Sequence, residues 1–508
     1  MGGGTQLSRI RKAGTAFILV CAALAMLALC SMSSPLYPLN IWGDANCLMT
    51  VGRAMKAGEV VYRDIYEQKG PTLYLAHMLA ACISDTGFFG VYLMEAACLT
   101  GFLAAARRLL RRRLHLTALP AAAVCGACIL ISWTFVRGDS AEEFCLPFAM
   151  GALCVFDGAL TKKTAPLPAR SLFLCGLFAG IVATVKFTLL GVFVGLCVIE
   201  GVLALREGGI LRALRSAGVF LSGMLLPILL WVIYFAANHA LGDFFTAYIY
   251  NNIFLYAGEG RMDLAGWISF LKGSGWWAVP ATLGLIAFAL DGREKPAVRL
   301  TVLVSFAVQF AAVVLPGRVW QYSLMAVAPY TVFGALEFGR LLERFLPVLG
   351  AAGEKKAEAA GGLSGLIRLA WPTGAAGALC FVLCWAVTPN AFLRGTTLGG
   401  TVQGRLTELI DPGSSLLQYA FLDDGLYLTT GTLPQEKYFV LLNVDLPEMK
   451  EELDRYVREG IPDYVLIIFR KLPEELQEKY KLIGVDIGYL DNNKQQKEYY
   501  LYRRRDLK

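Results

Sequence analysis

Apolar runs of about 20 residues recur along most of the chain and constrain its fold more than any other feature. A helix of that length spans the roughly 30 Å hydrocarbon core of a bilayer. Charged residues make up only 17% of the sequence, against about 25% in soluble domains. The sequence therefore predicts a polytopic α-helical membrane protein with about 11 transmembrane helices. They lie near 14–34, 88–106, 115–136, 144–160, 171–185, 187–205, 216–237, 265–290, 299–315, 320–338 and 369–388.

Two apolar segments need separate treatment. The first run follows Arg9, Arg11 and Lys12 and could be a signal peptide. No small-residue cleavage pattern fits before the acidic loop that follows it, so we interpret it as a true transmembrane helix. The segment 71–84 has only 14 residues, too few to span a bilayer. We expect it to be an interfacial helix.

Basic residues predict the orientation, because cytoplasmic loops are enriched in Lys and Arg. With the N-terminus inside, the internal segments hold 22 Lys and Arg and the external loops of the membrane part hold nine. This asymmetry predicts a multi-pass protein of the plasma membrane. Its N-terminus would be cytoplasmic, and the C-terminal part would lie outside.

The chain divides into a membrane domain, residues 1–388, and a smaller external domain, residues 389–508. The second part has no long apolar run and is expected to be α/β. The patterns predict strands at 437–444, 463–469 and 497–503, with helices at 446–460 and 473–482. Residues 350–368 are expected to form a flexible internal loop. We expect no catalytic residue beyond 388, and Asp423-Asp424-Gly425 is typical of a turn.

The first external loop, residues 35–87, is unusually rich in charge for a membrane connection. Asp44 begins an amphipathic stretch and should lie at the membrane boundary. The stretch YRDIYEQKGPTLY follows and brings Asp64, Glu67 and Lys69. A solvated loop, or an Asp44 that merely caps a helix beginning at Ala45, is the alternative.

A second set of charges is expected on the same face. Asp139 lies in a very short connection, FVRGDSAEEF, where Asp139 and Glu142 could instead cap the next helix. The cations are Arg137, Lys186 and Arg318, and Tyr322 follows Arg318 closely. Snorkelling would explain any one of these cations alone. Together, however, the carboxylates could hold a nucleophile or a divalent metal, and the cations could hold a phosphate.

Other chemistries find no support in the sequence. It has no phosphate-cradling glycine loop, no seryl or cysteinyl nucleophile motif and no patch suited to nucleic acid. The 13 cysteines lie almost entirely in or near apolar runs, where they are typical small core residues. The three histidines are too scattered to predict a metal cluster.

The early Asp44, the YRDIYEQKGPTLY stretch with its interfacial helix, and the short loop bearing Asp139 together resemble the GT-C polyprenol-dependent glycosyltransferases. The protein O-mannosyltransferase-like and aminoarabinose-transferase-like branches are the most similar. Glu67 and Lys69 match an acidic-then-basic pair before a proline, with Gln68 and Gly70 inserted here.

The resemblance implies transfer of a sugar from a polyprenyl-phosphate donor to an envelope glycan, lipid or protein on the outer face. It implies Asp44, Asp139 and Glu67 as catalytic carboxylates. Asp64 and Tyr322 are candidate substrate contacts, and Asp44 with Asp139 would hold a divalent metal if one is used. The donor phosphate would be bound by four cations: Lys69, Lys186, Arg318 and Arg137.

Two other functions compete with this one. A transporter or flippase of a lipid-linked glycan needs polar groups in mid-membrane, broken helices and often internal repeats. Glu95 is the one clear mid-span candidate in the sequence, and no convincing repeat is present. A scaffold built around the external domain would leave the acidic loops unexplained.

Overall fold

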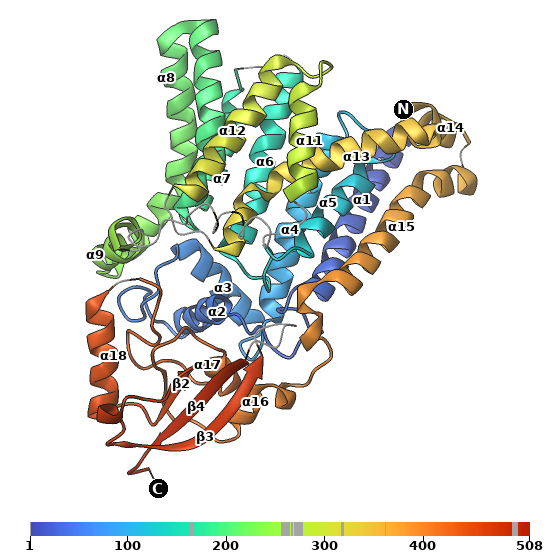
Figure 1. Cartoon of the computed structure of the whole chain (residues 1–508). Helices are drawn as coiled ribbons and strands as arrows, with labels where there is room; N and C mark the ends of the chain where they lie inside the picture. Colours follow the sequence, from blue (N-terminus) through green and yellow to red (C-terminus); the bar gives the residue numbers. More distant parts are fainter. Residues whose placement is uncertain are drawn as a thin grey trace.

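Long apolar helices form the larger part of the molecule and pack side by side (Figure 1). The computed structural model describes residues 2–162, 166–255, 278–315, 320–360, 362–444, 446–489 and 496–507, together with 265 and 268. The helices of this bundle are α1 (Gly2–Cys30), α4 (Phe89–Leu110), α5 (Ala118–Leu130), α6 (Ala141–Thr161), α7 (Ala169–Ala183), α8 (Gly191–Ala237), α11 (Ala278–Leu290), α12 (Pro296–Val314), α13 (Thr331–Phe345) and α15 (Gly362–Val387).

Six segments in the described part of the chain are long and apolar enough to cross a membrane. Four shorter apolar helices accompany them, among them α5, α7 and α11. One of the six includes α8, which is two antiparallel arms joined at Gly208 and Gly209, where the backbone leaves the helical conformation. The predicted class, a polytopic helical membrane protein with a small C-terminal α/β domain, is confirmed. The chain is a multi-pass membrane protein.

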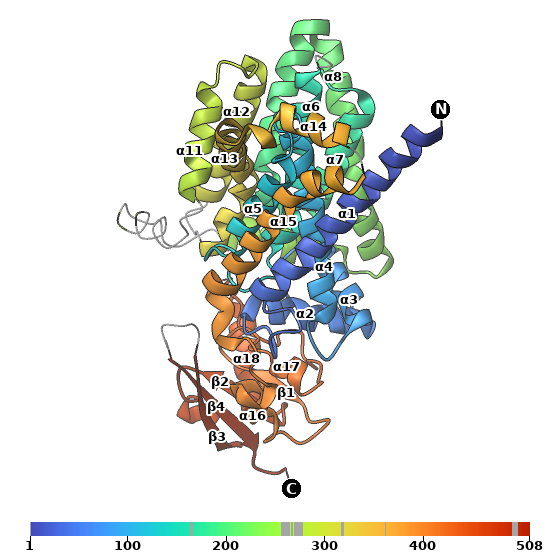
Figure 2. The same ribbon diagram turned by 90° about the vertical axis from the view of Figure 1, so that its right-hand side faces the viewer.

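Two helices lie across one end of the bundle, where the C-terminal domain is attached; we call this the domain end (Figures 1 and 2). They are α2 (Gly43–Lys56) and α3 (Pro71–Ile83), the latter being the segment predicted to be interfacial. They pack so closely that a Cβ on Gly52 would lie only 2.6 Å from the His77 backbone. The opposite end carries the N-terminus, the bend of α8 and the short helix α14 (Ala351–Ala360).

The C-terminal domain is built on a four-stranded sheet in the order β1-β2-β4-β3. The strands are β1 (Leu416–Gln418), β2 (Tyr464–Ile468), β3 (Tyr480–Tyr489) and β4 (Gln496–Arg504). β1 and β2 are parallel and the other pairs are antiparallel. The helices α16 (Val402–Thr407), α17 (Leu426–Thr429) and α18 (Pro447–Glu459) complete the domain.

Three local predictions were wrong. Residues 437–444 are apolar and mostly buried but pair with no strand in the described structure, since packing alone accounts for their hydrophobicity. Residues 473–482 form a 3-10 turn (Glu474–Leu476) and the start of β3, because tertiary pairing with β4 overrides the helical pattern. Residues 350–368 are helical in α14 and α15 where they are described, so they are not a structureless loop.

The C-terminal domain is fastened to α2 by buried polar contacts. The Arg53 guanidinium donates to three carbonyl oxygens around the end of α17: Tyr427 at 2.8 Å, Gly431 at 2.9 Å and Thr432 at 3.1 Å. One turn away, the Thr50 hydroxyl donates to the Asp423 carboxylate at 2.6 Å. Asp423 is therefore part of a buried junction as well as a turn.

Replacing Arg53 with Met is expected to loosen this junction. Arg53 is 8% exposed, and leaving buried carbonyl oxygens without their hydrogen-bond donor costs roughly 1–3 kcal/mol. Limited proteolysis should then release the C-terminal domain much faster than in the unmodified protein. Arg458→Met, an exposed change on α18, is the control and should leave the cleavage rate unchanged. Equal rates in all three proteins would contradict the assignment of Arg53 as the fastening residue.

Candidate active site

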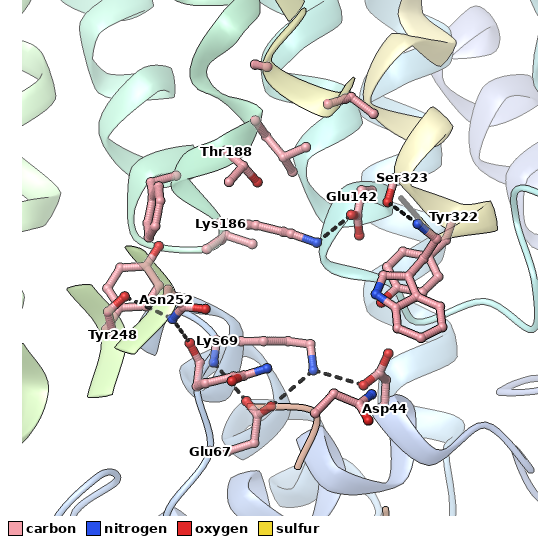
Figure 3. A pocket seen from close by; sticks show the side chains of 18 of the residues that line it. Asp44, Glu67, Lys69, Glu142, Lys186, Thr188, Tyr248, Asn252, Tyr322 and Ser323 are labelled. Atoms are coloured by element: carbon pink, nitrogen blue, oxygen red, sulfur yellow. Dashed lines mark hydrogen bonds and ion pairs between the residues drawn. The ribbon is translucent and has the colours of Figure 1, made fainter. Parts of the chain in front are cut away.

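A cavity of about 500 Å³ lies at the domain end, where the bundle meets α2, α3 and the C-terminal domain. Figure 3 shows its polar side chains facing one another across an open space. The charged lining residues are Asp44, Glu67, Lys69, Glu142 and Lys186. The C-terminal domain supplies Leu422, Leu442 and Asn443 to the same lining.

Asp44 lies in the first turn of α2, where a negative charge is stabilised by the helix dipole. It is not the cap that the alternative interpretation requires. The helix begins one residue earlier, at Gly43, and the residue at the N-cap is Trp42, which makes no side-chain cap bond. A Cβ on Gly43 would lie 2.9 Å from Leu422 Cβ. Glycine at this position therefore allows the C-terminal domain to pack against the start of α2, next to Asp44.

The segment that bears Lys69 packs against the end of α7. The Tyr62 hydroxyl donates to the Lys69 carbonyl oxygen at 2.6 Å. The next residue, Gly70, donates its N–H to the Val185 carbonyl oxygen at 3.0 Å. Gly70 lies so close to Thr184 that a Cβ would be 2.1 Å from its carbonyl oxygen. Because Val185 precedes Lys186, this backbone contact brings two distant lysines to one cavity.

Lys69 lies between two carboxylates (Figure 3). Its Nζ is 3.1 Å from Asp44 Oδ1 and 3.1 Å from Glu67 Oε1. The side chains are 17% exposed for Lys69, 15% for Asp44 and 1% for Glu67. Burial disfavours the ammonium charge, but the two carboxylates outweigh burial and raise the pKa of Lys69 well above its usual value. Lys69 therefore stays charged through neutral and moderately alkaline pH.

The two carboxylates beside Lys69 differ in how many of their oxygens accept hydrogen bonds. Glu67 also accepts from the Lys69 backbone N–H at 2.9 Å and from the Tyr74 hydroxyl, so both of its oxygens are occupied. Asp44 accepts through Oδ1 alone; within the described residues its Oδ2 has no hydrogen-bond partner. Asp44 therefore has an oxygen to offer to a substrate, whereas Glu67 holds Lys69 in place.

The opposite wall carries a second ion pair. Lys186 Nζ is 2.7 Å from Glu142 Oε1, in the first turn of α6. The same ammonium group lies over the Tyr322 ring, 5.4 Å from its centroid, and that ring packs edge-on against Trp42. Glu142 thus lines the cavity, although the sequence indicated it only as a possible helix cap. Its position in the same short connection as Asp139 could have marked it as a candidate.

Several cavity residues were missed by sequence reasoning. Tyr248 and Asn252 lie on a stretch of π-helix (Phe245–Leu255) that no apolar period predicts. Asn252 donates to the Gln68 carbonyl oxygen at 2.6 Å, which holds this helix against the loop that bears Lys69. Trp320, Ser323 and the three residues of the C-terminal domain also line the cavity. Tertiary packing brings these residues to the cavity, so no local pattern in the sequence could reveal them.

Three predicted residues of the described part of the chain are not among those that line the cavity. Asp139 is fully buried, and its Oδ1 is 2.8 Å from His77 Nε2. Burial raises the pKa of Asp139. Asp64 pairs with its neighbour Arg63 at 2.7 Å. Arg137 donates to Asn390 at 3.0 Å. Arg318 lies outside the described residues.

The two carboxylates that were predicted as possible metal ligands each pair with a different side chain. Asp44 is paired with Lys69, and Asp139 is paired with His77. In the described part of the chain, no group of three or more His, Cys, Asp or Glu side chains could hold a metal ion. All 13 cysteines are free, and Cys125 contacts the Thr331 hydroxyl, as expected of a residue in helix packing.

The arrangement of membrane helices, crosswise helices and C-terminal domain is the fold of the GT-C membrane glycosyltransferases. The particular solved structures that it resembles are those of ArnT from Cupriavidus metallidurans. The form bound to undecaprenyl phosphate superimposes with a TM-score of 0.59 at 13% sequence identity, covering 96% of this chain and 98% of that one. The apo form gives 0.57 at 12% identity, with 97% and 98% coverage. No family model and no curated protein sequence matches the chain. At this level of identity the likeness establishes the fold.

Proposed function

We propose that this protein is a glycosyltransferase that moves a sugar from a polyprenyl-phosphate donor to a hydroxyl or amine of an envelope glycan, lipid or protein. One observation carries the proposal. A cavity at the domain end has Asp44 on one wall, with one carboxylate oxygen available, and Lys186 on the wall opposite. Its volume of about 500 Å³ falls within the range of small-molecule sites.

The residues suit a direct displacement at the sugar carbon. An acceptor O–H or N–H gives its proton to Asp44 as the new glycosidic bond forms. The bond from the sugar carbon to the phosphate oxygen breaks, and its electron pair leaves with the phosphate through an oxocarbenium-like transition state. Lys186 stabilises the departing charge. Lys69 contributes a second positive charge beside Asp44, and Glu67 holds Lys69.

The other predicted residues take lesser parts in this proposal. The Tyr322 ring lies beneath the Lys186 ammonium group and is suited to contact the sugar. Asp139, Asp64 and Arg137 receive no direct substrate contact because their side chains are engaged outside the cavity. We place the cavity on the extracytoplasmic side of the plasma membrane, because the basic residues concentrate at the opposite end.

Transport of a lipid-linked glycan gains nothing from the structure. Glu95, the mid-span acid that could have served a transporter, accepts from the Ser31 hydroxyl at 2.8 Å and from the Asp139 backbone N–H at 2.8 Å. Its carboxylate thus joins α4 to the segments that follow α1 and precede α6. Glu95 is fully buried and is not among the residues that line the cavity at the domain end.

Release of polyprenyl phosphate tests the proposal. The full-length protein in lipid nanodiscs is incubated with a panel of polyprenyl-phosphate sugars and a detergent extract of the cell envelope. We expect one donor to be consumed with release of its lipid phosphate and transfer of its sugar to an acceptor, both followed by mass spectrometry. Transport of an intact donor between leaflets without release would refute the proposed function.

Replacing Lys186 with Gln is expected to impair use of the donor selectively. A hydrogen bond to a charged group contributes about 1.5–3 kcal/mol, so kcat/KM for the donor should fall roughly 10- to 100-fold. Lys186→Arg should recover part of the loss. Lys56→Gln serves as the matched control, because Lys56 is on the same end of the molecule but pairs with Asp85, away from the cavity. A donor kcat/KM that is unchanged in Lys186→Gln would remove Lys186 from the phosphate site.

A further inference from the structure

Two adjoining cavities lie between α7 and the two arms of α8, away from the cavity of the candidate active site. The first has a volume of about 430 Å³, and its lining is almost entirely apolar, with Phe193, Val194, Phe220, Leu221 and Met224 among its residues. The second has a volume of about 540 Å³ and is lined by residues 166–168, just before α7, and by Arg212 and Arg215. The two share Leu172 and Ser216, so an elongated molecule could occupy both.

The bend of α8 creates the charged end of this pair. Gly209 has φ +67° and ψ −166°, a conformation that residues with a side chain rarely adopt. The returning arm therefore begins immediately after the bend and carries Arg212 and Arg215 within its first two turns. Glu200 secures the arrangement, since it accepts from the Leu167 N–H at 3.0 Å and from the Ser216 hydroxyl at 3.3 Å.

The two arginines are available to a ligand. Arg212 is 3.8 Å from Glu207, and both side chains are about half exposed, so this pair contributes little. Arg215 is exposed, and it forms no ion pair with any described residue. Further cations follow the same segments of the chain: Lys162 lies just after α6, Arg170 on α7 and Arg206 on the first arm of α8.

The tip of α8 has the character of a segment at a membrane surface. Ile210, Leu211 and Leu214 are among the exposed apolar side chains, and they alternate with Arg212 and Arg215. Apolar groups beside cations match the boundary between acyl chains and headgroups. Basic pockets between helices on the cytoplasmic side of a membrane also bind acidic lipid headgroups.

We propose that these joined cavities bind a phospholipid with an anionic headgroup. The lipid phosphate contacts Arg212 and Arg215 in the polar cavity, and an acyl chain lies in the apolar cavity between α7 and α8. This site is separate from the cavity of the proposed glycosyl transfer and does not depend on that function. Both the charge and the chain of the ligand are needed.

Native mass spectrometry of the full-length protein in detergent provides the test, with dioleoyl phosphatidylglycerol, dioleoyl phosphatidylcholine and glycerol 3-phosphate as probes. We expect phosphatidylglycerol to bind more tightly than phosphatidylcholine, and glycerol 3-phosphate not to compete. In a variant with Arg212→Gln and Arg215→Gln, the affinity for phosphatidylglycerol should fall roughly 10- to 30-fold, towards that for phosphatidylcholine. Arg206→Gln, on the same hairpin but outside both cavities, should leave it unchanged.

A second variant tests the apolar cavity separately. Cys197→Trp would fill it, and we expect weaker binding of both phospholipids with an unchanged thermal midpoint. Equal binding of the two phospholipids by the unmodified protein would overturn the proposal, and so would an effect of Arg206→Gln as large as that of the double variant. Effective competition by glycerol 3-phosphate would show a free-phosphate site and would also overturn it. Glycosyl transfer should proceed in every variant, so failure here is distinguishable from failure of the proposed function.

Discussion

Asp44→Asn is expected to lower the rate of sugar transfer by about 10²–10⁴-fold, the usual effect of losing a general base. The amide has nearly the shape of the carboxylate but cannot accept the proton of the acceptor. The structure makes the substitution clean, because Asp44 does not cap α2 and, among the described residues, its side chain hydrogen-bonds only to Lys69, through Oδ1. Turnover and donor affinity are measured separately, by release of polyprenyl phosphate and by binding of a labelled donor.

The matched control is Asp85→Asn, which removes an acid from the same stretch of the chain, residues 35–87, but from an exposed pair with Lys56. Turnover in this control should be normal. The protein level and the donor affinity of Asp44→Asn should stay close to those of the unmodified protein. If Asp44→Asn retained near-normal turnover, the base would have to be sought elsewhere in the cavity, first at Glu142.

Replacing Lys69 with Met is expected to cause the largest loss of stability. It would leave Glu67, which is 1% exposed, without its counter-charge, and breaking a buried ion pair in this way costs roughly 3–5 kcal/mol. It should also slow sugar transfer, because the cavity loses the positive charge that Lys69 contributes beside Asp44. Thermal unfolding and kcat/KM for the donor measure the two effects.

A double variant separates stability from chemistry. Adding Glu67→Gln to Lys69→Met removes the uncompensated charge, so much of the lost stability should return. The fall in kcat/KM for the donor should remain, because the cavity still lacks the Lys69 cation. Recovery of both properties would mean that Lys69 acts only by neutralising Glu67, which would contradict its proposed contribution of charge to the cavity.

The parts of this fold that a periodic pattern encodes could be predicted from the sequence. Apolar runs located most of the membrane helices, and the short run at 71–84 marked α3. The charges predicted on one face pointed to Asp44, Glu67, Lys69 and Lys186, and Tyr322 was noted beside Arg318; these five residues all line one cavity. Capping or snorkelling could explain any one of the charges, but not several of them on the same face.

The remainder depended on contacts between distant segments. Nothing local in the sequence shows that Gly70 bonds to Val185, and that contact decides that Lys69 and Lys186 share a cavity. Asp139 looked equivalent to Asp44 in its loop, yet His77 from α3 takes up its carboxylate in the interior. Residues 437–444 had a strand-like pattern because they are buried, and burial alone does not specify pairing.

The contact of Gly43 with Leu422 has a consequence for how such proteins can change during evolution. The residue beside Asp44 and the C-terminal domain touch so closely that neither surface can vary alone. Arg53 and Thr50 add further matched positions on the same helix. The C-terminal domain is therefore not an interchangeable module. Recombination that grafts a foreign domain after residue 388 would inherit a mismatched α2, so we expect this domain to change by coordinated substitution on both sides of the junction.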